Sequence, residues 1–225
     1  MDPDWRVFPN HEALLDAALA VIRQSEAESG HTFSCVLAGG RTPLDLYRRL
    51  ADEPMQWDKW RVYLGDERCL PPEHPERNSL QAARAFLGRV PIPPEHVCFP
   101  SAELGAAAAA LRYNEQLRNA GVFDLVLLGL GEDGHTASLF PGRDIGAEQG
   151  APDVLPVFDA PKPPPERISL SAQRLSRART VLFLVAGAGK REAATRWRQG
   201  LEIPAGRIQA QQRLVVLADE LACPR

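Results

Sequence analysis

The sequence has few of the residues that would support a disulfide framework, a metal site or a membrane span. Its 4 cysteines lie far apart and form no CxxC pair, so we expect buried free thiols and not disulfides or zinc. No HExxH motif or comparable ligand spacing is present, so we predict no metal. No apolar run is as long as a membrane span, and the N-terminus lacks a charged-then-apolar signal pattern. We therefore expect a cytoplasmic protein that does not bind membranes.

An excess of charge of one sign is also lacking. Lys and Arg number 26 against 29 Asp and Glu, and the formal net charge is −3. Nothing resembles a DNA-reading module, so the sequence gives no reason to expect nucleic acid as a partner. With 225 residues, of which 44% are hydrophobic and 24% charged, the composition is that of an ordinary globular protein, and we predict one domain over 1–225.

Apolar strand patterns alternate with helical patterns through most of the chain, and no internal repeat is present. This alternation predicts an α/β fold, in which a mostly parallel sheet is covered by helices on both faces and ligands bind at the carboxyl ends of the strands. The sheet pattern begins after a first helix, which we expect between Asn10 and Gly30. Further strands are expected at 32–37, 60–64, 123–128, 154–158, 167–170 (edge or antiparallel), 180–185 and 213–217, and further helices at 43–50, 78–87, 102–119, 172–175, 191–197 and, as a single turn, 218–222.

The stretch 124–142 combines a buried-strand pattern with a glycine-rich turn. Formally, GLGEDG satisfies the dinucleotide-binding pattern, so a Rossmann enzyme is an alternative. Glu132 and Asp133 argue against it, because they would place negative charge where a pyrophosphate must lie. Pro141 would also stop the following helix after about two turns, which is too short for a full crossover.

The same turn is better suited to acid–base chemistry at His135. Glu132 or Asp133, beside it, would orient the imidazole as a general base requires. The alternative is that His135 only caps a short helix from Thr136. Ser138 is a poor candidate for a nucleophile, because no GxSxG elbow surrounds it.

A second glycine turn, at 39–43, follows the strand at 32–37. Thr42 fits the N-cap of the next helix and Pro43 its first turn, so free N–H groups would point together at one spot. Such a spot binds phosphate, helped by the helix dipole. A plain tight turn explains the pattern equally well.

Two further loops follow strands in the same way. The first, 65–68, is polar, and the second, 186–190, ends in Lys190. A Walker motif is excluded at the second loop, because Arg191 stands where a magnesium-binding Ser or Thr is needed, but Lys190 is placed to bind a single phosphate. We expect these loops to converge with 39–43 and 129–136 at one edge of the sheet, where Arg167 could also face the pocket.

These loops together resemble the 6-phosphogluconolactonase family. The matching stretches are LAGGRTPLDLYRRL, YLGDERCLPPEHPERNS, DLVLLGLGEDGHTASLFPG, PPPERISLSAQRL and FLVAGAGKREA, over about residues 36 to 194. The chain departs from the family near its C-terminus, with PAG at 204–206 and Leu217-Ala218-Asp219 where an aromatic often precedes the aspartate.

The resemblance implies the sugar-phosphate isomerase-like α/β fold and hydrolysis of 6-phospho-D-glucono-1,5-lactone in the oxidative pentose phosphate pathway. It implies a sugar-phosphate lactone as the bound partner, no cofactor, and a monomer or weak homo-oligomer. The implied catalytic residues are His135 as the base, Asp133 or Glu132 as its orienting group, and Arg68 or Arg167 at the developing charge, a choice that the sequence leaves open. The implied substrate-binding residues are Gly39, Gly40, Arg41, Thr42, Asp66, Arg167 and Lys190.

Two other functions fit parts of the pattern. An amino-sugar phosphate deaminase or isomerase shares the fold and a GxDGH loop, but that class continues with IAFNEP where this chain has TASLFPG. A non-catalytic sugar-phosphate sensor would need a DNA-binding region, and we expect no room for one before the sheet.

Overall fold

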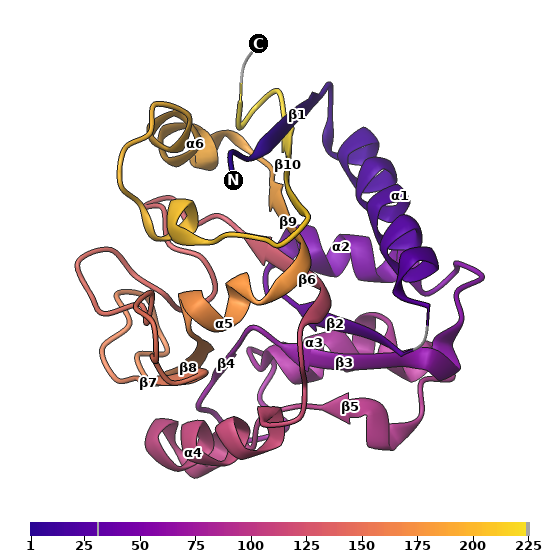
Figure 1. The fold of residues 1–225 in the computed structure, drawn as a ribbon, viewed down its shortest axis with the longest axis vertical. Helices are drawn as coiled ribbons and strands as arrows, with labels where there is room; N and C mark the ends of the chain where they lie inside the picture. The colour runs from indigo at the N-terminus through magenta and orange to yellow at the C-terminus, as the bar shows by residue number, and fades with distance from the viewer. Residues whose placement is uncertain (31, 224–225) are drawn as a thin grey trace.

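The computed structural model describes residues 1–30 and 32–223. Its centre is a seven-stranded sheet in the order β1-β10-β9-β6-β2-β3-β5, and every neighbouring pair in it is parallel (Figure 1). The carboxyl ends of all these strands therefore meet at one edge. The strands are β1 (Asp4–Phe8), β2 (Phe33–Leu37), β3 (Trp60–Leu64), β5 (Val97–Cys98), β6 (Phe123–Gly129), β9 (Ala178–Val185) and β10 (Arg213–Asp219).

Helices cover both faces of this sheet. The side chains of β6 alternate between two hydrophobic clusters: Leu125 and Leu127 belong to one cluster, and Val126 and Leu128 to the other. A strand buried on both faces reads as a continuous apolar run, as this one does. The first cluster includes residues of α1 (His11–Ser29), α2 (Arg41–Leu50) and α3 (Asn78–Ala85), and the second includes residues of α4 (Ala106–Leu117), α5 (Ala172–Ser176) and α6 (Arg191–Arg198).

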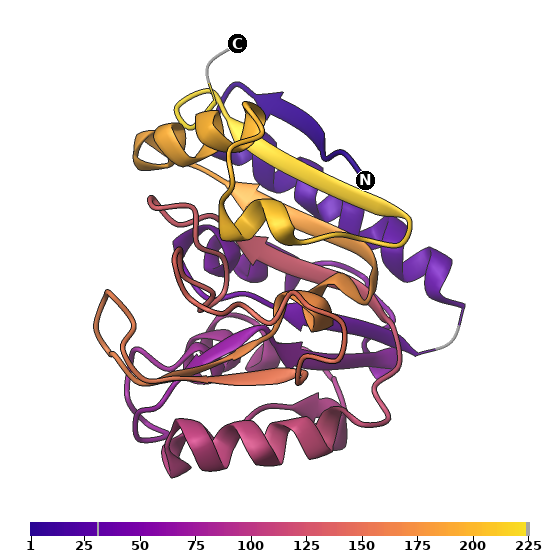
Figure 2. The same cartoon turned by 60° about the vertical axis from the view of Figure 1, so that its left-hand side comes forward.

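A small antiparallel sheet lies beside the main one, in the order β4-β8-β7. It consists of β4 (Asp66–Arg68), β7 (Val154–Val157) and β8 (Arg167–Leu170). The loop that joins β7 to β8 projects from the body of the molecule in both views (Figures 1 and 2). Short 3₁₀ helices complete the described elements: η1 (Trp57–Lys59), η2 (Leu87–Arg89), η3 (Pro94–His96), η4 (Ala102–Leu104), η5 (Ala188–Lys190) and η6 (Pro204–Arg207).

The predicted fold class is confirmed, and so is the first helix. Asn10 caps α1, since its side-chain oxygen accepts a 2.9 Å hydrogen bond from the N–H of Ala13, and Gly30 ends the helix with a left-handed backbone. The start of the sheet was wrong, because β1 precedes this helix and lies beside β10 in both views (Figures 1 and 2). Its partner strand is almost the whole chain away, so no local pattern reveals it.

Several element boundaries also differ from prediction. In the described residues 136–140 there is no helix, but a tight turn closed by a bridge between Thr136 and Leu139. The N-cap of α2 is Gly40 and not Thr42. The expected helix at 102–119 is interrupted at Gly105, β8 is the central strand of the small sheet and not an edge strand, and the residues expected as a terminal helical turn complete β10 and then form a plain turn.

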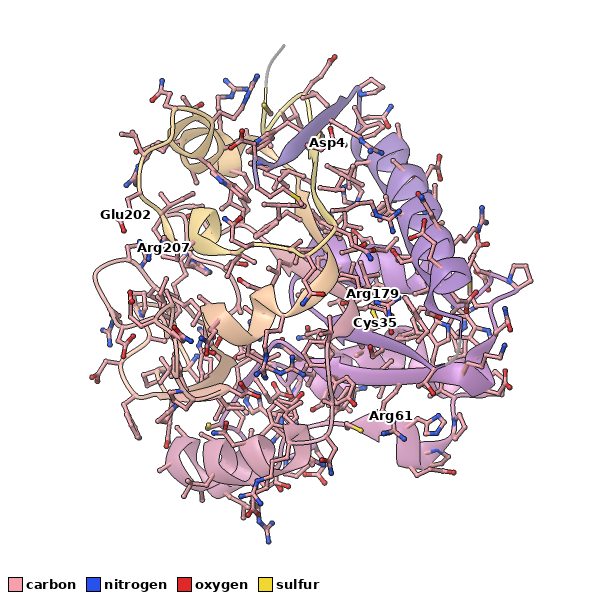
Figure 3. The ribbon with its side chains drawn as sticks, viewed as in Figure 1. Asp4, Cys35, Arg61, Arg179, Glu202 and Arg207 are labelled. Atoms are coloured by element: carbon pink, nitrogen blue, oxygen red, sulfur yellow. The ribbon has the colours of Figure 1, made fainter. Side chains whose placement is uncertain are left out.

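The cysteines are free thiols, as predicted, although only two of them are fully buried. Cys35 lies within β2 in the interior (Figure 3), and Cys223 is also buried, whereas Cys69 and Cys98 are partly exposed. Burial raises the pKa of Cys69 to about 12, so this thiol is not activated. Among the described residues, none of the helices has both the length and the apolar character needed to cross a membrane.

Candidate active site

A pocket of about 390 Å³ opens at the carboxyl ends of the parallel strands. It is lined by residues from all four loops that follow β2, β3, β6 and β9, so these loops converge as predicted. Every predicted site residue except Glu132 and Asp133 is part of its wall. The lining residues are Ala38 to Pro43, Gly65, Asp66, Arg68, Asn78, Leu128 to Gly131, His135 to Ala137, Arg167, Leu184, Ala186 and Lys190.

His135 lines this pocket, and Asp133 holds its ring through the nitrogen Nδ1. Oδ1 of Asp133 lies 2.5 Å from Nδ1 of the imidazole and also accepts a 3.1 Å hydrogen bond from the backbone N–H of His135. Burial opposes ionisation of the Asp133 carboxyl, but the hydrogen bonds and positive charge of His135 outweigh it and lower its pKa. With Nδ1 engaged, Nε2 is the ring nitrogen left for chemistry.

Two glycines explain why the chain can place the ring there. A Cβ at Gly131 would lie 2.0 Å from Nδ1 of His135, so the imidazole occupies space that only glycine leaves free. Gly134 has a φ of +90° and packs against Ile203, and its carbonyl accepts a 3.1 Å hydrogen bond from Ala205. The turn is therefore fixed by the segment that contains η6, where Glu202 and Arg207 form a 3.1 Å ion pair at the surface (Figure 3).

Glu132 points away from the histidine. Its Oε2 lies 3.3 Å from Nζ of Lys162, in the loop between β7 and β8, and both side chains are mostly exposed. The structure therefore places Asp133, and not Glu132, against His135. A part for Glu132 in catalysis stays a prediction.

Arg68 and Arg167 stand side by side in the wall of the pocket, because β4 and β8 pair them directly. Arg167 is buried and donates to three backbone carbonyls of the projecting loop, those of Lys162, Pro163 and Pro164, at 2.8 to 3.2 Å. Burial lowers its pKa from the ordinary arginine value. Arg68 donates through Nη1 to the carbonyl of Glu76 at 2.6 Å.

Asp66 is buried and accepts hydrogen bonds from side chains in two other segments of the chain. Its Oδ2 accepts a 2.6 Å hydrogen bond from the hydroxyl of Ser138, and its Oδ1 lies 3.1 Å from the amide nitrogen of Asn78. Ser138 is itself 2% exposed. Its hydroxyl is therefore engaged in structure, which agrees with the prediction that it is not the nucleophile.

The far end of the pocket has the features of a phosphate site. Gly40, at the N-cap of α2, has a φ of +106° and makes no side-chain cap, so the first N–H groups of the helix, at Arg41 and Thr42, face the pocket wall uncapped. Lys190, at the start of α6, lines the same pocket. Partial burial lowers the pKa of Lys190, and the charge of Lys162 acts in the same direction.

Sequence reasoning missed Asn78 and Glu67. Glu67 is fully buried and caps α3: its carboxylate accepts from the backbone N–H groups of Arg68, Asn78 and Ser79 at 2.8 to 2.9 Å. It also pairs with Arg77 at 3.1 Å. The only available signal was that Asn78 was expected to start a helix, which gives no indication of where its side chain points.

The fold and the site can now be compared with those of known proteins, first through the family to which the sequence belongs. Residues 9–217 match the family model described as glucosamine-6-phosphate isomerases/6-phosphogluconolactonase. The chain belongs to this family.

Curated relatives and solved structures narrow the comparison. The 6-phosphogluconolactonase of a Nostoc species is 36% identical over 233 aligned residues, which cover 96% of this chain and 95% of the relative. That of Mycobacterium tuberculosis is 34% identical, with coverage of 100% and 99%. The crystal structure of 6-phosphogluconolactonase from Thermotoga maritima superposes with a TM-score of 0.89 at 26% identity, covering 97% of this chain and 100% of that one. A monomeric glucosamine-6-phosphate deaminase superposes with a TM-score of 0.83 at 20% identity, covering 97% and 98% of the two chains, which is a likeness of fold alone.

Proposed function

We propose that this protein hydrolyses 6-phospho-D-glucono-1,5-lactone to 6-phosphogluconate, the second step of the oxidative pentose phosphate pathway. The observation that carries the proposal is the pairing of His135 with Asp133 at 2.5 Å, in a pocket whose wall also includes the uncapped start of α2 and Lys190. A general base and a phosphate site in one pocket fit a phosphorylated ester as the substrate. The relatives at 34–36% identity that are named as this enzyme support the same activity.

The proposed chemistry uses His135 twice. Nε2 removes a proton from a water molecule as the water oxygen attacks the lactone carbonyl, and the imidazolium then returns a proton to the ring oxygen as the carbon–oxygen bond breaks. Asp133 fixes the tautomer and stabilises the charged ring. The product is the open-chain carboxylic acid, and the reaction needs neither a metal nor an organic cofactor.

We assign the stabilisation of the tetrahedral oxyanion to Arg68. Arg167 already directs Nε and Nη2 at loop carbonyls, whereas Arg68 engages a carbonyl through Nη1. A cation held in place beside developing negative charge lowers the barrier more than the same cation does in bulk water. Arg167 instead fixes the loop between β7 and β8, which borders the site.

We assign the 6-phosphate to Gly39, Gly40, Arg41, Thr42 and Lys190. Backbone N–H groups at a helix N-terminus and a lysine are the donors that phosphate prefers. Binding the phosphate away from the carbonyl would fix the lactone in an attack geometry, which is where binding energy increases the rate.

The principal alternative is deamination or isomerisation of an amino-sugar phosphate, a reaction named for one structural neighbour. That neighbour is 20% identical, so its likeness carries the fold and not the reaction. The sequence TASLFPG after His135 forms the tight turn in which Ser138 is bound to Asp66.

We further propose that residues 1–225 act as one domain, in the cytoplasm, as a monomer or weak homo-oligomer and without nucleic acid. A role as a non-catalytic sensor is disfavoured by the intact pairing of His135 with Asp133.

The test generates the lactone in place, because it hydrolyses spontaneously. Glucose 6-phosphate and its dehydrogenase supply the lactone continuously, and the formation of 6-phosphogluconate is measured with and without the protein. We expect acceleration well above the spontaneous rate. A rate equal to the spontaneous one would refute the proposal.

A further inference from the structure

The hydrogen bonds of Asp66 connect two parts of the site that are far apart in sequence. Ser138 lies in the turn at 131–138 that carries His135, called the catalytic turn below, and Asn78 begins α3 and contacts Gly39 in the turn at 39–43, called the phosphate turn below. Both side chains are at most 3% exposed, and both donate to the same carboxylate, Ser138 to Oδ2 at 2.6 Å and Asn78 to Oδ1 at 3.1 Å. Asp66 is 8% exposed, so the three groups form a buried connection.

Ser138 is held by two hydrogen bonds to residues of the small sheet. Asp66 on β4 and Ser169 on β8 are directly opposite partners in the small sheet. The hydroxyl of Ser138 donates to Asp66, and its backbone N–H donates to Oγ of Ser169 at 3.2 Å. One residue of the catalytic turn is thus docked onto both strands.

On the other side the connection reaches the turn at Gly39. The amide nitrogen of Asn78 donates to the Asp66 backbone carbonyl at 3.0 Å as well as to its carboxylate. Its side-chain oxygen lies against Gly39, where a Cβ would come within 2.2 Å of it. Asn78 therefore supports the wall of the turn that leads into α2.

We propose that Asp66, held by Ser138 and Asn78, sets the distance between the catalytic turn and the phosphate turn, so that Ser138 and Asn78 are positioning residues for a substrate that spans both. This proposal rests on the function proposed above. A lactone bound by its phosphate can react only if its carbonyl then lies under Nε2 of His135. An error of about 1 Å in such placement reduces rates by about a hundredfold.

The test compares two substrates that differ in the phosphate. For 6-phosphoglucono-1,5-lactone the distance between the two turns matters, whereas for unphosphorylated glucono-1,5-lactone it does not. We expect Ser138→Ala and Asn78→Ala each to lower the ratio of the two kcat values, phosphorylated over unphosphorylated, by about tenfold. The double variant should lower the ratio little further, because both changes act on one carboxylate.

The matched control is Ser34→Ala. Ser34 also donates its hydroxyl to a buried aspartate, Oδ2 of Asp124 at 2.7 Å, but at the amino ends of β2 and β6, on the opposite edge of the sheet from the pocket. Ser34→Ala removes the same kind of hydroxyl-to-carboxylate hydrogen bond, together with one that Oγ accepts from the N–H of Asp124 at 3.0 Å, so it should cost at least as much stability, which thermal unfolding of all the variants measures. The ratio of kcat values should stay at the wild-type value.

Equal losses on both substrates in Ser138→Ala and Asn78→Ala would overturn the proposal, since they would indicate damage to the catalytic turn alone. So would a change in the ratio for Ser34→Ala, which would indicate a general effect of stability. If the wild type turns over the unphosphorylated lactone too slowly to measure, Asn78→Ala decides on the phosphorylated substrate, because Asn78 contacts Asp66 and Gly39: a fall in kcat at constant KM supports the connection, and an unchanged kcat contradicts it. Absence of wild-type lactonase activity would remove the proposed function itself, whereas an active wild type with an unchanged ratio removes only this inference.

Discussion

Arg68 and Arg167 face each other as a directly opposed pair on the antiparallel strands β4 and β8, where like charges destabilise a sheet. The charge of the Asp66 carboxylate raises the pKa of Arg167, whereas the charge of Arg68 lowers it. In the proposed mechanism Arg68 stabilises an oxyanion that is present only during the reaction, and the negative charge of that oxyanion would relieve the repulsion.

This arrangement predicts a gain in stability with a loss of activity. Arg68→Gln should lower kcat by about 10² to 10³, the usual effect of removing an oxyanion donor. It should leave the free energy of unfolding unchanged or raise it by up to about 1 kcal/mol, since the opposed charge is gone. Steady-state kinetics and urea unfolding check the two parts, with Arg112→Gln on the exposed face of α4 as the control. Full activity in Arg68→Gln would move the oxyanion role elsewhere.

Removal of the general base has a simple expected outcome. His135→Ala should lower kcat by about 10² to 10⁴ with little change in the affinity for phosphorylated ligands. His11→Ala is the control, because His11 also contacts a carboxylate, Asp45 at 3.2 Å, but away from the pocket. Spontaneous hydrolysis must be subtracted in both assays. Turnover equal to that of the wild type would exclude His135 from the mechanism.

The two acidic residues before the histidine predict different pH profiles. The lowered pKa of Asp133 keeps its carboxylate ionised across the neutral range, where it favours the protonated imidazole. Asp133→Asn removes that negative charge at nearly constant shape, so the acidic limb of the kcat/KM profile should move to lower pH. Glu132→Gln, whose partner is Lys162, should leave the limb in place. A shift in the Glu132 variant but not in the Asp133 variant would reverse the assignment.

Phosphate binding by Lys190 predicts a separation of the two kinetic constants. In the proposed site the lysine holds the phosphate both before and during the reaction, so Lys190→Ala should raise KM while kcat changes less. Lys59→Ala, in the exposed η1 segment, is the control. A collapse of kcat at constant KM would place Lys190 with the catalytic group.

The lowered pKa of Lys190 also predicts a pH dependence of product binding. Burial disfavours the charged form, so the free protein loses this proton below the ordinary lysine value of 10.5. The affinity for 6-phosphogluconate should therefore fall as pH rises through that lowered pKa, and titration calorimetry measures it without interference from lactone hydrolysis. Lys190→Arg keeps its charge at these pH values and should not show the fall. The same fall in the arginine variant would assign the effect to another group.

The sequence predicted the parts of the site that depend on local chain signals. Glycines after apolar strands marked the loops, and the topology of a parallel sheet then brings those loops to one edge. The pairing of Asp133 with His135 was also within reach, since only Gly134 separates the two residues. Each of these features is encoded within a few residues of where it acts.

The features that the sequence did not predict depend on partners far away along the chain. β1 forms only against β10, and Glu67 caps a helix that begins eleven residues later. The helix expected after Gly134 is replaced by a turn, because Ser138 is bound to Asp66 and Ala137 takes a φ of +48°. Such contacts override local propensity, which is a weak guide where tertiary packing competes with it.

The pairing of β1 with β10 has a consequence for the order in which the molecule is assembled during synthesis. β1 is translated long before β10, the strand that pairs with it, so the backbone groups of β1 on that side stay unpaired until the residues around 213–219 have been made. Strands β2, β3, β5 and β6, which neighbour one another, can form a sheet earlier, since their contacts lie within the first 129 residues. His135 and the turn at Gly40 then exist before Lys190 has been translated. The proposed phosphate site is therefore completed only after strands β2, β3, β5 and β6 can have formed their sheet.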